Sequence, residues 1–247
     1  PNKTSGVDPD MGEVVALQRL QILCEKIGLI HKPGAKIVIC SDGRVFSDLV
    51  GVSDEDVSRY SRKIEAIIEE FNLFHLSTFH LENIFAVENF NDLRAHMVEN
   101  FARPLEEVKN NVREDDTARI LFNGIHRFIL EDQKVLKPEI SNNQLSIASK
   151  ETAYQVVQRS NAWSKAVESV FPNAVRLSIH PQNPDSAKLG IRLLKSTSLW
   201  RTPWHSVALG DGKNFVLTTK KEAEALGALP QLFMNKYSYY ALAAEVL

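Results

Sequence analysis

The chain has 247 residues, a formal net charge of -2 and a pI of about 6.4. This length can bury one full core, and the charge balance excludes the basic surface of a protein that binds nucleic acid or anionic membranes. No apolar run approaches the roughly 20 residues that span a bilayer, and the first residues lack the apolar core of a secretory signal. Two cysteines without metal-ligand spacing complete the pattern of a cytoplasmic, enzyme-sized domain.

The first two thirds of the chain are predicted to be mostly helical, because apolar residues recur at helical spacing. The first helix is expected to end where Gly28 takes the C′ position, and a capping box of Ser53 and Asp56 opens the next one. Pro104 divides a later helical pattern, and the polar stretch 141–149 is expected to be a loop. The expected helices cover residues 11–27, 53–71, 90–110, 114–130 and 150–170.

Strand patterns dominate the last third. Residues 174–180 alternate apolar and polar side chains, and Gly210-Asp211-Gly212 joins two strand patterns as a hairpin turn. An early apolar run at 36–40 is typical of a buried strand and is expected to join the late sheet. Further strand candidates are 191–194, 205–209 and 215–219, while 74–85 is expected to be extended. These patterns predict a single domain over 1–247 of mixed α/β (α+β) class, with a central mixed sheet flanked by helices.

A polar run, Ser41-Asp42-Gly43-Arg44, directly follows the expected strand at 36–40. Open α/β sheets bind ligands just past the carboxyl ends of their strands. Asp42 can exchange protons, Gly43 allows a tight backbone, and Arg44 presents a planar fork to a carboxylate or phosphate. Taken alone, an Asp-Gly-Arg triplet is more often a turn with a solvent-facing arginine.

The alternating pattern at 174–180 places Arg176, Ser178 and His180 on one face of the expected strand, opposite three apolar side chains. A guanidinium, a hydroxyl and an imidazole in a row can form one wall of a polar pocket. Pro181 ends the strand and leaves His180 at its carboxyl edge. A solvated face of the sheet explains the same pattern equally well.

The segment Trp200–His205 combines two indoles, the guanidinium of Arg201 and the imidazole of His205. Pro203 biases the preceding residue towards extended geometry and so stiffens this loop. Such a loop suits an aromatic amino acid, whose ring would pack against Trp204 while the arginine fork binds its carboxylate. The alternative is that at least one of the two indoles anchors the core.

Five segments of the chain resemble one known family in family order. SDGRVFSDLVGV (41–52) resembles the signature of the isocyanide (isonitrile) synthases, the pyoverdine/dityrosine biosynthesis family. The other similar segments are LFNGIHRFILED (121–132), RSNAW with FPNAVRLSIHPQ (159–163 and 171–182), KLGIRLL (188–194) and WRTPWHSVAL (200–209). Family members carry more sequence upstream of the position that Pro1 occupies, so the N-terminal part of the family domain is expected to be missing.

The resemblance implies an isonitrile synthase that converts the α-amino group of L-tyrosine or L-tryptophan to an isocyanide. Ribulose 5-phosphate would donate the one carbon through an imine intermediate, and the family implies no metal or organic cofactor. A downstream iron- and 2-oxoglutarate-dependent oxygenase is the pathway neighbour that the family suggests. Which of the two amino acids is the substrate stays open.

Roles for the candidate residues follow from what this chemistry needs. Asp42 and His205 are assigned to acid–base work, with His180 as a second proton-transfer group or a phosphate donor. Arg44 and Arg176 are expected to clamp anions. The remaining residues expected to contact substrate are Ser41, Phe46, Ser178, Arg201, Trp204 and Lys213. Of these, Lys213 follows the hairpin turn, where a lysine is more often simply exposed.

Two other functions remain open on the sequence alone. Asp42, His180 and His205 could together hold a metal ion in a metal-dependent lyase or oxygenase, although nothing in their spacing requires it. The chain could also be a catalytically silent relative that only binds a metabolite. Neither a phosphate-cradling GxxxxGK nor a GxGxxG motif follows a strand, which disfavours nucleotide cofactors.

Overall fold

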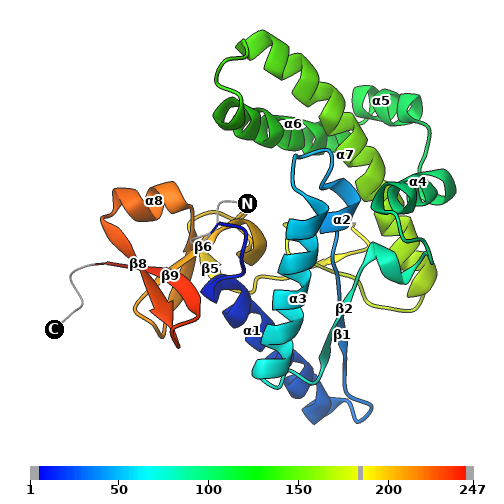
Figure 1. Cartoon of the computed structure of the whole chain (residues 1–247). Helices are drawn as coiled ribbons and strands as arrows, with labels where there is room; N and C mark the ends of the chain where they lie inside the picture. Colours follow the sequence, from blue (N-terminus) through cyan, green and yellow to red (C-terminus); the bar gives the residue numbers. More distant parts are fainter. Residues whose placement is uncertain (1–5, 183–185, 243–247) are drawn as a thin grey trace. The chain divides into compact units, whose positions relative to one another are not determined.

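The computed structural model describes residues 6–182 and 186–242. Helices predominate in the part between residues 43 and 170, and strands predominate after it, so the predicted mixed α/β class is confirmed (Figure 1). The helices are α1 (Met11–Ile30), α2 (Gly43–Phe46), α3 (Asp54–Glu70), α4 (Phe90–Phe101), α5 (Leu105–Glu114), α6 (Asp116–Leu136), α7 (Asn142–Val170) and α8 (Lys220–Ala225), with 3-10 helices η1 (Leu81–Asn83) and η2 (Pro203–His205).

The strands form one mixed sheet and two strand pairs. The five-stranded sheet has the order β5-β7-β6-β9-β8, in which β6 pairs antiparallel with β7 and parallel with β9. β1 pairs with β2 alone, and β3 pairs with β4. The strands are β1 (Ile37–Cys40), β2 (Leu76–Phe79), β3 (Leu177–Ser178), β4 (Leu189–Gly190), β5 (Lys195–Ser196), β6 (Val207–Gly210), β7 (Phe215–Thr218), β8 (Ala228–Phe233) and β9 (Tyr237–Leu242).

The chain divides into two compact units, and each is assembled from segments that are far apart in the sequence. Unit 1 comprises residues 1–39, 58–78 and 174–247, and unit 2 comprises residues 40–57 and 79–173. The chain therefore passes between the units four times. This division alone does not set the number of domains, so the single domain stays a prediction.

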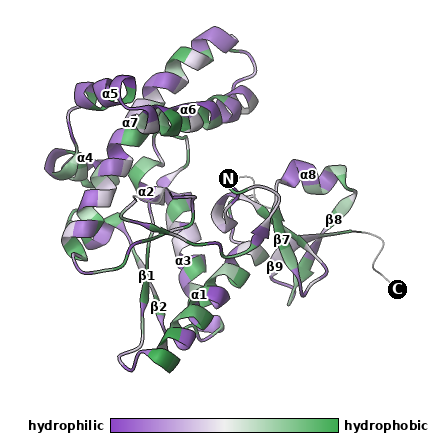
Figure 2. Cartoon of the chain, turned by 180° about the vertical axis from the view of Figure 1, so that it is seen from behind, coloured by the Kyte–Doolittle hydropathy of each residue, from purple (hydrophilic) through white to green (hydrophobic). Residues whose placement is uncertain are grey.

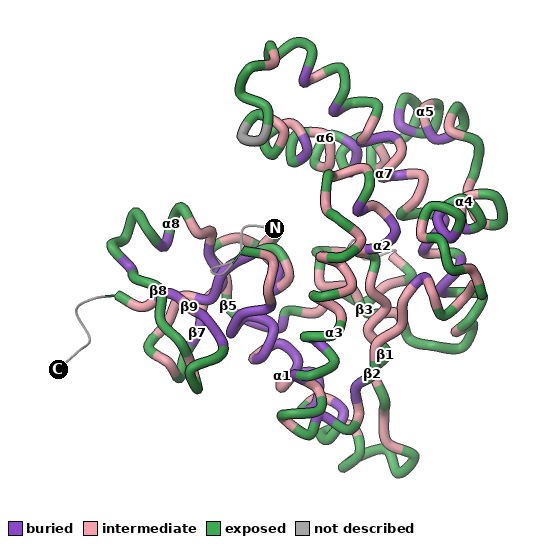
Figure 3. Tube along the Cα trace, in the orientation of Figure 1, coloured by how far each residue is buried: buried purple, intermediate pink, exposed green. Residues whose placement is uncertain are grey.

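Unit 1 packs α1 and the later part of α3 with the five-stranded sheet. The first helix is capped by Asp10, whose carboxylate accepts a hydrogen bond from the Gly12 N–H, while Glu13 accepts one from the Asp10 N–H. A run of buried residues follows along α1 (Figure 3). Leu17, Ile67 and Leu217 are among the fully buried side chains of this core.

Unit 2 is mainly helical, and α4, α5 and α6 pack against the long helix α7 (Figure 1). Hydrophilic residues alternate with apolar ones along α5 and α6, as expected for helices with one buried face (Figure 2). One core cluster surrounds Val45, Leu93 and Met97, and Trp163 of α7 belongs to it. In a second cluster the rings of Phe122 and Tyr154 stack with their centroids 4.3 Å apart.

Several boundaries in the helical part match the predictions. The Asp56 N–H donates to the Ser53 hydroxyl as helix α3 begins, and Pro104 separates α4 from α5. Two predictions there are wrong. Helix α1 runs through Gly28 to Ile30, and its C-cap is His31, whose backbone N–H donates to the Ile27 carbonyl oxygen. Residues 142–149 are helical, because Ser141 accepts a hydrogen bond from the Gln144 N–H and caps α7.

Three strand predictions also need correction. The early strand β1 pairs with β2 instead of joining the late sheet, and Val38 in it is exposed. The expected strand at 174–180 is reduced to β3, with Val175 and Leu177 exposed although the alternation placed them on the buried face. Residues 191–194 lie between β4 and β5 and form no strand. The hairpin was predicted correctly, since Gly210 of β6 lies opposite Phe215 of β7.

None of the helices within residues 6–182 and 186–242 combines the length and apolar character that crossing a bilayer requires.

Replacing Gly210 with alanine is expected to destabilise the hairpin. A Cβ atom at this position would lie 2.0 Å from the Asn214 carbonyl oxygen, which is backbone and cannot move aside. Overpacking of this kind costs about 2 kcal/mol, which lowers the melting temperature by roughly 5 °C. Gly28→Ala is the matched control, because its Cβ meets nothing within 4 Å. Equal melting temperatures for the two variants would contradict this account.

Candidate active site

The chain turns directly after β1 in unit 2, and this turn presents the first group of candidate residues. The Ser41 N–H donates to the Phe79 carbonyl oxygen over 2.9 Å, so the turn begins from the paired end of the strand. Asp42 occupies the N-cap position of the short helix α2 and is exposed. Phe46, at the end of α2, packs against the core of unit 2.

Arg44 in this turn is almost fully buried, with 4% of its surface exposed. Its Nη1 donates to the Asp54 carboxylate over 3.0 Å, and its Nε donates to Glu82 over 2.9 Å. The guanidinium lies over the Phe90 ring at 3.7 Å from the ring centroid. In this structure the arginine therefore binds acidic groups of the protein itself, and the expectation that it clamps a substrate anion stays a prediction.

Asp54 also binds Arg94 of α4, which is as deeply buried as Arg44. Two guanidinium nitrogens of Arg94 donate to the two Asp54 oxygens over 2.9 and 3.1 Å, a bidentate arrangement. Burial of the Asp54 carboxyl raises its pKa, but hydrogen bonds from Arg94, Arg44 and Ser47 outweigh that effect and lower the pKa to about 2. Asp54 is therefore ionised at neutral pH.

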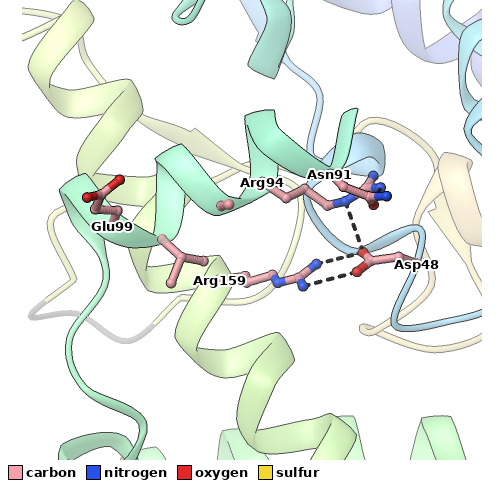
Figure 4. A pocket seen from close by; sticks show the side chains of 7 residues that line it. Asp48, Asn91, Arg94, Glu99 and Arg159 are labelled. Carbon is pink, nitrogen blue, oxygen red and sulfur yellow. Dashed lines mark hydrogen bonds and ion pairs between the residues drawn. The ribbon is translucent and has the colours of Figure 1, made fainter. Parts of the chain in front are cut away.

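The ion pairs continue to α7 through Asp48. Arg159 donates to both Asp48 oxygens over 2.6 and 3.0 Å, and Arg94 contacts the same carboxylate at 3.5 Å (Figure 4). These residues line a pocket of about 450 Å³, together with Asn91 and Glu99. Here the segment that begins at Ser41 meets the one that begins at Arg159. Both arginines in this pocket are engaged by acids, Arg159 by Asp48 and Arg94 by Asp54 and Asp48.

A second pocket, of about 330 Å³, lies in unit 1. Its lining includes His180, Arg192 and Arg201, with Gln182 and Leu199 beside them. His180 follows β3, Arg192 follows β4, and Arg201 precedes η2. The structure thus brings two of the predicted site residues, His180 and Arg201, to one pocket. Of the three side chains expected to share a face at 174–180, only His180 is among its described lining residues.

The side chain of Arg201 is held from one edge. Its Nε donates to the Thr197 hydroxyl over 2.7 Å, and its Nη2 donates to Glu222 over 2.6 Å. Hydrogen bonds from the Thr218 hydroxyl and the Thr219 N–H lower the pKa of Glu222, and the charge of Arg201 lowers it further. Glu222 is therefore a fixed anion that orients the guanidinium.

His180 has an imidazole suited to proton transfer. Partial loss of hydration lowers its pKa below the ordinary 6.5, and the positive charge of Lys188 lowers it further. The ring is therefore mostly neutral at pH 7 and can accept a proton. Its backbone N–H donates to the Ser178 hydroxyl over 3.2 Å, and Gln182 donates to the same hydroxyl over 3.0 Å. Through these two hydrogen bonds Ser178 helps to fix the conformation of the backbone that carries the imidazole.

The other predicted residues of unit 1 are not among the described lining residues of this pocket, and they lie in different settings. Trp204 packs against the main core, which matches the expectation for one of the two indoles, while Trp200 is largely exposed. His205 ends η2 and is exposed. Arg176 is half-buried next to β3, and its carbonyl oxygen accepts a hydrogen bond from the Leu189 N–H. Lys213 is exposed in the hairpin turn.

Arg192 is the pocket residue that the sequence reasoning did not single out. It lies inside the segment 188–194, for which the sequence predicts a family resemblance and no individual site residue. A signal was present, because Arg192 is the one charged side chain in the otherwise apolar run Ile191–Leu194. Such a position places a cation on a chain segment whose neighbours are anchored in the core.

A metal site was one of the open alternatives. Among the residues that the structure describes, no group of three or more His, Cys, Asp or Glu side chains is placed to hold a metal ion. Asp42 belongs to unit 2, whereas His180 and His205 belong to unit 1.

Known proteins resemble this chain over nearly its whole length. A family model described as pyoverdine/dityrosine biosynthesis protein matches residues 1–229. The L-tryptophan isonitrile synthase AmbI2 of Fischerella ambigua is 43% identical over 245 residues, which cover 99% of this chain and 74% of the relative. The L-tyrosine isonitrile synthase of Pseudomonas aeruginosa is 39% identical over 249 residues, with 99% of this chain and 76% of the relative covered.

A solved structure is also similar. The crystal structure of the PvcA protein from Pseudomonas aeruginosa matches with a TM-score of 0.88 at 38% sequence identity. The match covers 95% of this chain and 78% of that chain.

Replacement of Asp54 by asparagine is expected to destabilise the protein at pH 7 by roughly 3 kcal/mol, because Arg44 and Arg94 lose a shared anion. The effect must shrink in acid. A carboxyl with a lowered pKa stabilises the fold above its unfolded pKa of about 4, and that contribution is lost as the pH falls through about 2. Thermal unfolding at several pH values checks this. Asp132→Asn, at an exposed position of α6, is the control; a pH-independent gap between Asp54→Asn and wild type would contradict the assignment.

Proposed function

This chain belongs to the pyoverdine/dityrosine biosynthesis family, and we propose that it is an isonitrile synthase acting on an aromatic L-amino acid. The family resemblance drawn from its five segments is confirmed. The observation that carries the proposal is the identity of about two residues in five with synthases for L-tryptophan and L-tyrosine, over nearly the whole chain. An enzyme is therefore the conclusion, in place of a silent metabolite-binding relative.

The proposed one-carbon donor is ribulose 5-phosphate. The amine of the amino acid would attack the ketone of the sugar and form an imine with loss of water. Proton shifts, loss of phosphate and carbon–carbon cleavage would then leave one sugar carbon on the nitrogen as the isocyanide. These steps need groups that move protons near neutral pH and cations that hold a phosphate and a carboxylate.

The unit 1 pocket supports this chemistry with His180 and Arg201. A neutral imidazole can take the proton that the amine releases on attack, and a guanidinium fixed by Glu222 can hold an anion without reorganising. Asp42 and His205 each remain proposed for acid–base work, because both have exposed side chains able to exchange protons.

For the remaining predicted site residues, we propose the roles that their surroundings in the structure support. Ser178 would orient the segment of His180, and Trp204 would pack beside the substrate ring from its place against the core. Arg176, Ser41 and Lys213 stay proposed substrate contacts. Arg44 and Phe46 pack into unit 2, and this packing favours a structural role for both, in which they hold the turn that carries Asp42.

The cellular setting is proposed from the family alone. A cytoplasmic enzyme that needs no cofactor would hand its isocyanide to a tailoring enzyme, of which an iron- and 2-oxoglutarate-dependent oxygenase is the expected type.

Isotopically labelled ribulose 5-phosphate tests the reaction directly. The purified protein is incubated with the labelled sugar and either L-tyrosine or L-tryptophan, with and without a chelator. Mass spectrometry is expected to detect an isocyanide that carries the label from one of the amino acids, with equal yield in chelator. Failure to form a labelled product from both amino acids would refute the proposal for this chain.

Replacement of His180 by alanine is expected to lower kcat by about 100-fold or more while KM for the amino acid changes little, because general acid–base catalysis contributes that much. Since the pKa of His180 is lowered, the neutral base persists in mild acid, and the acid limb of the wild-type pH–rate profile should lie below pH 6.5. Lys188→Gln should move this limb upward, because it removes a positive charge near the ring. His31→Ala, at an exposed position, is the control. Wild-type kcat in His180→Ala would exclude the role.

A further inference from the structure

The unit 1 pocket carries an excess of positive charge in its lining. Arg192 and Arg201 both line it, and none of its described lining residues is an aspartate or glutamate. Within 6–182 and 186–242, the one acidic partner of these two arginines is Glu222, which binds Arg201 from outside the lining. Among the described residues, the pocket thus holds one guanidinium that no acid compensates, and a bound anion would balance it.

Arg192 has an open guanidinium on a fixed backbone. Its side chain is exposed, and no hydrogen bond or ion pair joins it to another residue within 6–182 and 186–242. The next residues, Leu193 and Leu194, are buried in the core, and the Leu193 carbonyl oxygen accepts a hydrogen bond from Arg19 over 2.5 Å. The backbone at Arg192 is therefore held in place, while no described residue engages the five N–H donors of its guanidinium.

Arg201 offers its other edge to the same pocket. Thr197 and Glu222 occupy its Nε and one Nη2 donor, and within the described chain its Nη1 has no partner. A guanidinium fixed in this way loses little side-chain entropy when it binds a ligand oxygen. Because its Nε edge is occupied, the two-bond fork of Nε with Nη2 is unavailable to an incoming anion.

A phosphate monoester matches this donor set better than a carboxylate does. A carboxylate is satisfied by one complete arginine fork, whereas a phosphate carries a charge of about -1.5 to -2 at pH 7 and three acceptor oxygens. Two separate guanidinium groups, one of them half engaged, can share those oxygens. The volume of about 330 Å³ lies at the lower end of the range of roughly 300–1,000 Å³ for ligand pockets, and fits one small ligand.

We propose that this pocket is the phosphate subsite of the enzyme, in which Arg192 and the open edge of Arg201 hold the phosphate group of the sugar. The identity of the phosphate carrier rests on the proposed function, whereas the binding of a phosphate monoester rests on the pocket itself. Arg192 supplies the free charge, and Glu222 positions Arg201 without touching the ligand.

Isothermal titration calorimetry with ribulose 5-phosphate tests the proposal apart from turnover. Arg192→Ala is expected to raise the dissociation constant about tenfold or more, since a charge-assisted hydrogen bond is lost, and Arg192→Lys should recover part of the affinity. Inorganic phosphate should compete in the wild type. Arg62→Ala, which removes an exposed arginine of α3 in the same unit, should bind like wild type. Circular dichroism confirms that each variant is folded.

The possible outcomes test the phosphate subsite and the proposed reaction independently of each other. Wild-type protein that makes no isocyanide but binds ribulose 5-phosphate through Arg192 keeps the subsite and refutes the reaction. Isocyanide formation with unchanged KM and dissociation constant for the sugar in Arg192→Ala keeps the reaction and overturns the subsite. A loss of affinity for the amino acid alone would make the pocket a carboxylate site and would also overturn the proposal, as would wild-type protein that binds no sugar phosphate.

Discussion

The carboxylate of Asp54 organises unit 2, because two buried arginines depend on it at once. Arg44 and Arg94 are each 4% exposed, and a buried guanidinium is costly unless it is paired and hydrogen-bonded. Asp54 serves both, and Arg94 reaches onward to Asp48, which binds Arg159. The turn after β1, the start of α3, and helices α4 and α7 are therefore joined by one chain of alternating charges.

This chain of charges gives the turn after β1 its function in the fold. The sequence alone predicts that Arg44 is the ligand-binding group of that turn, because an arginine just past the end of a strand suits an anionic ligand. In the structure Arg44 is bound by Asp54 and Glu82 and covered by Phe90. The side chain that the turn leaves exposed is that of Asp42, two residues earlier. Anchoring Arg44 restrains the backbone that presents Asp42.

The parts of the fold that the sequence predicted are those decided within a few residues. The cap at Ser53, the break at Pro104 and the turn at Gly210-Asp211-Gly212 each depend on local hydrogen bonding or on an allowed backbone angle. The strand that pairs with β1, and the extent to which residues 174–180 form a strand, depend on packing between segments that are distant in the sequence. Apolar alternation cannot report that packing, and it misplaced Val175 for that reason.

In the candidate site, too, the sequence predicts what is decided locally and misses what distant residues decide. His180 and Arg201 could be proposed from their neighbours in the sequence, and both line one pocket. What the sequence cannot convey is which arginines are already neutralised. Arg44 and Arg159 are paired by acids 10 and 111 residues away, and Arg201 by one 21 residues away. Arg192 differs from all three, because no acid in the described chain reaches it.

Charge that the fold leaves unpaired is the charge that remains available to a ligand. An arginine inside an ion-pair network can bind an anion only by giving up its protein partner, and that exchange lowers the net affinity. An exposed arginine on a backbone fixed by buried neighbours has no such cost. The same residue type therefore stabilises unit 2 at Arg44 and Arg94, whereas at Arg192 no acid of the described chain competes with a ligand. The difference lies in the acids around each arginine, and so the ligand-binding charge of this chain is expected in unit 1.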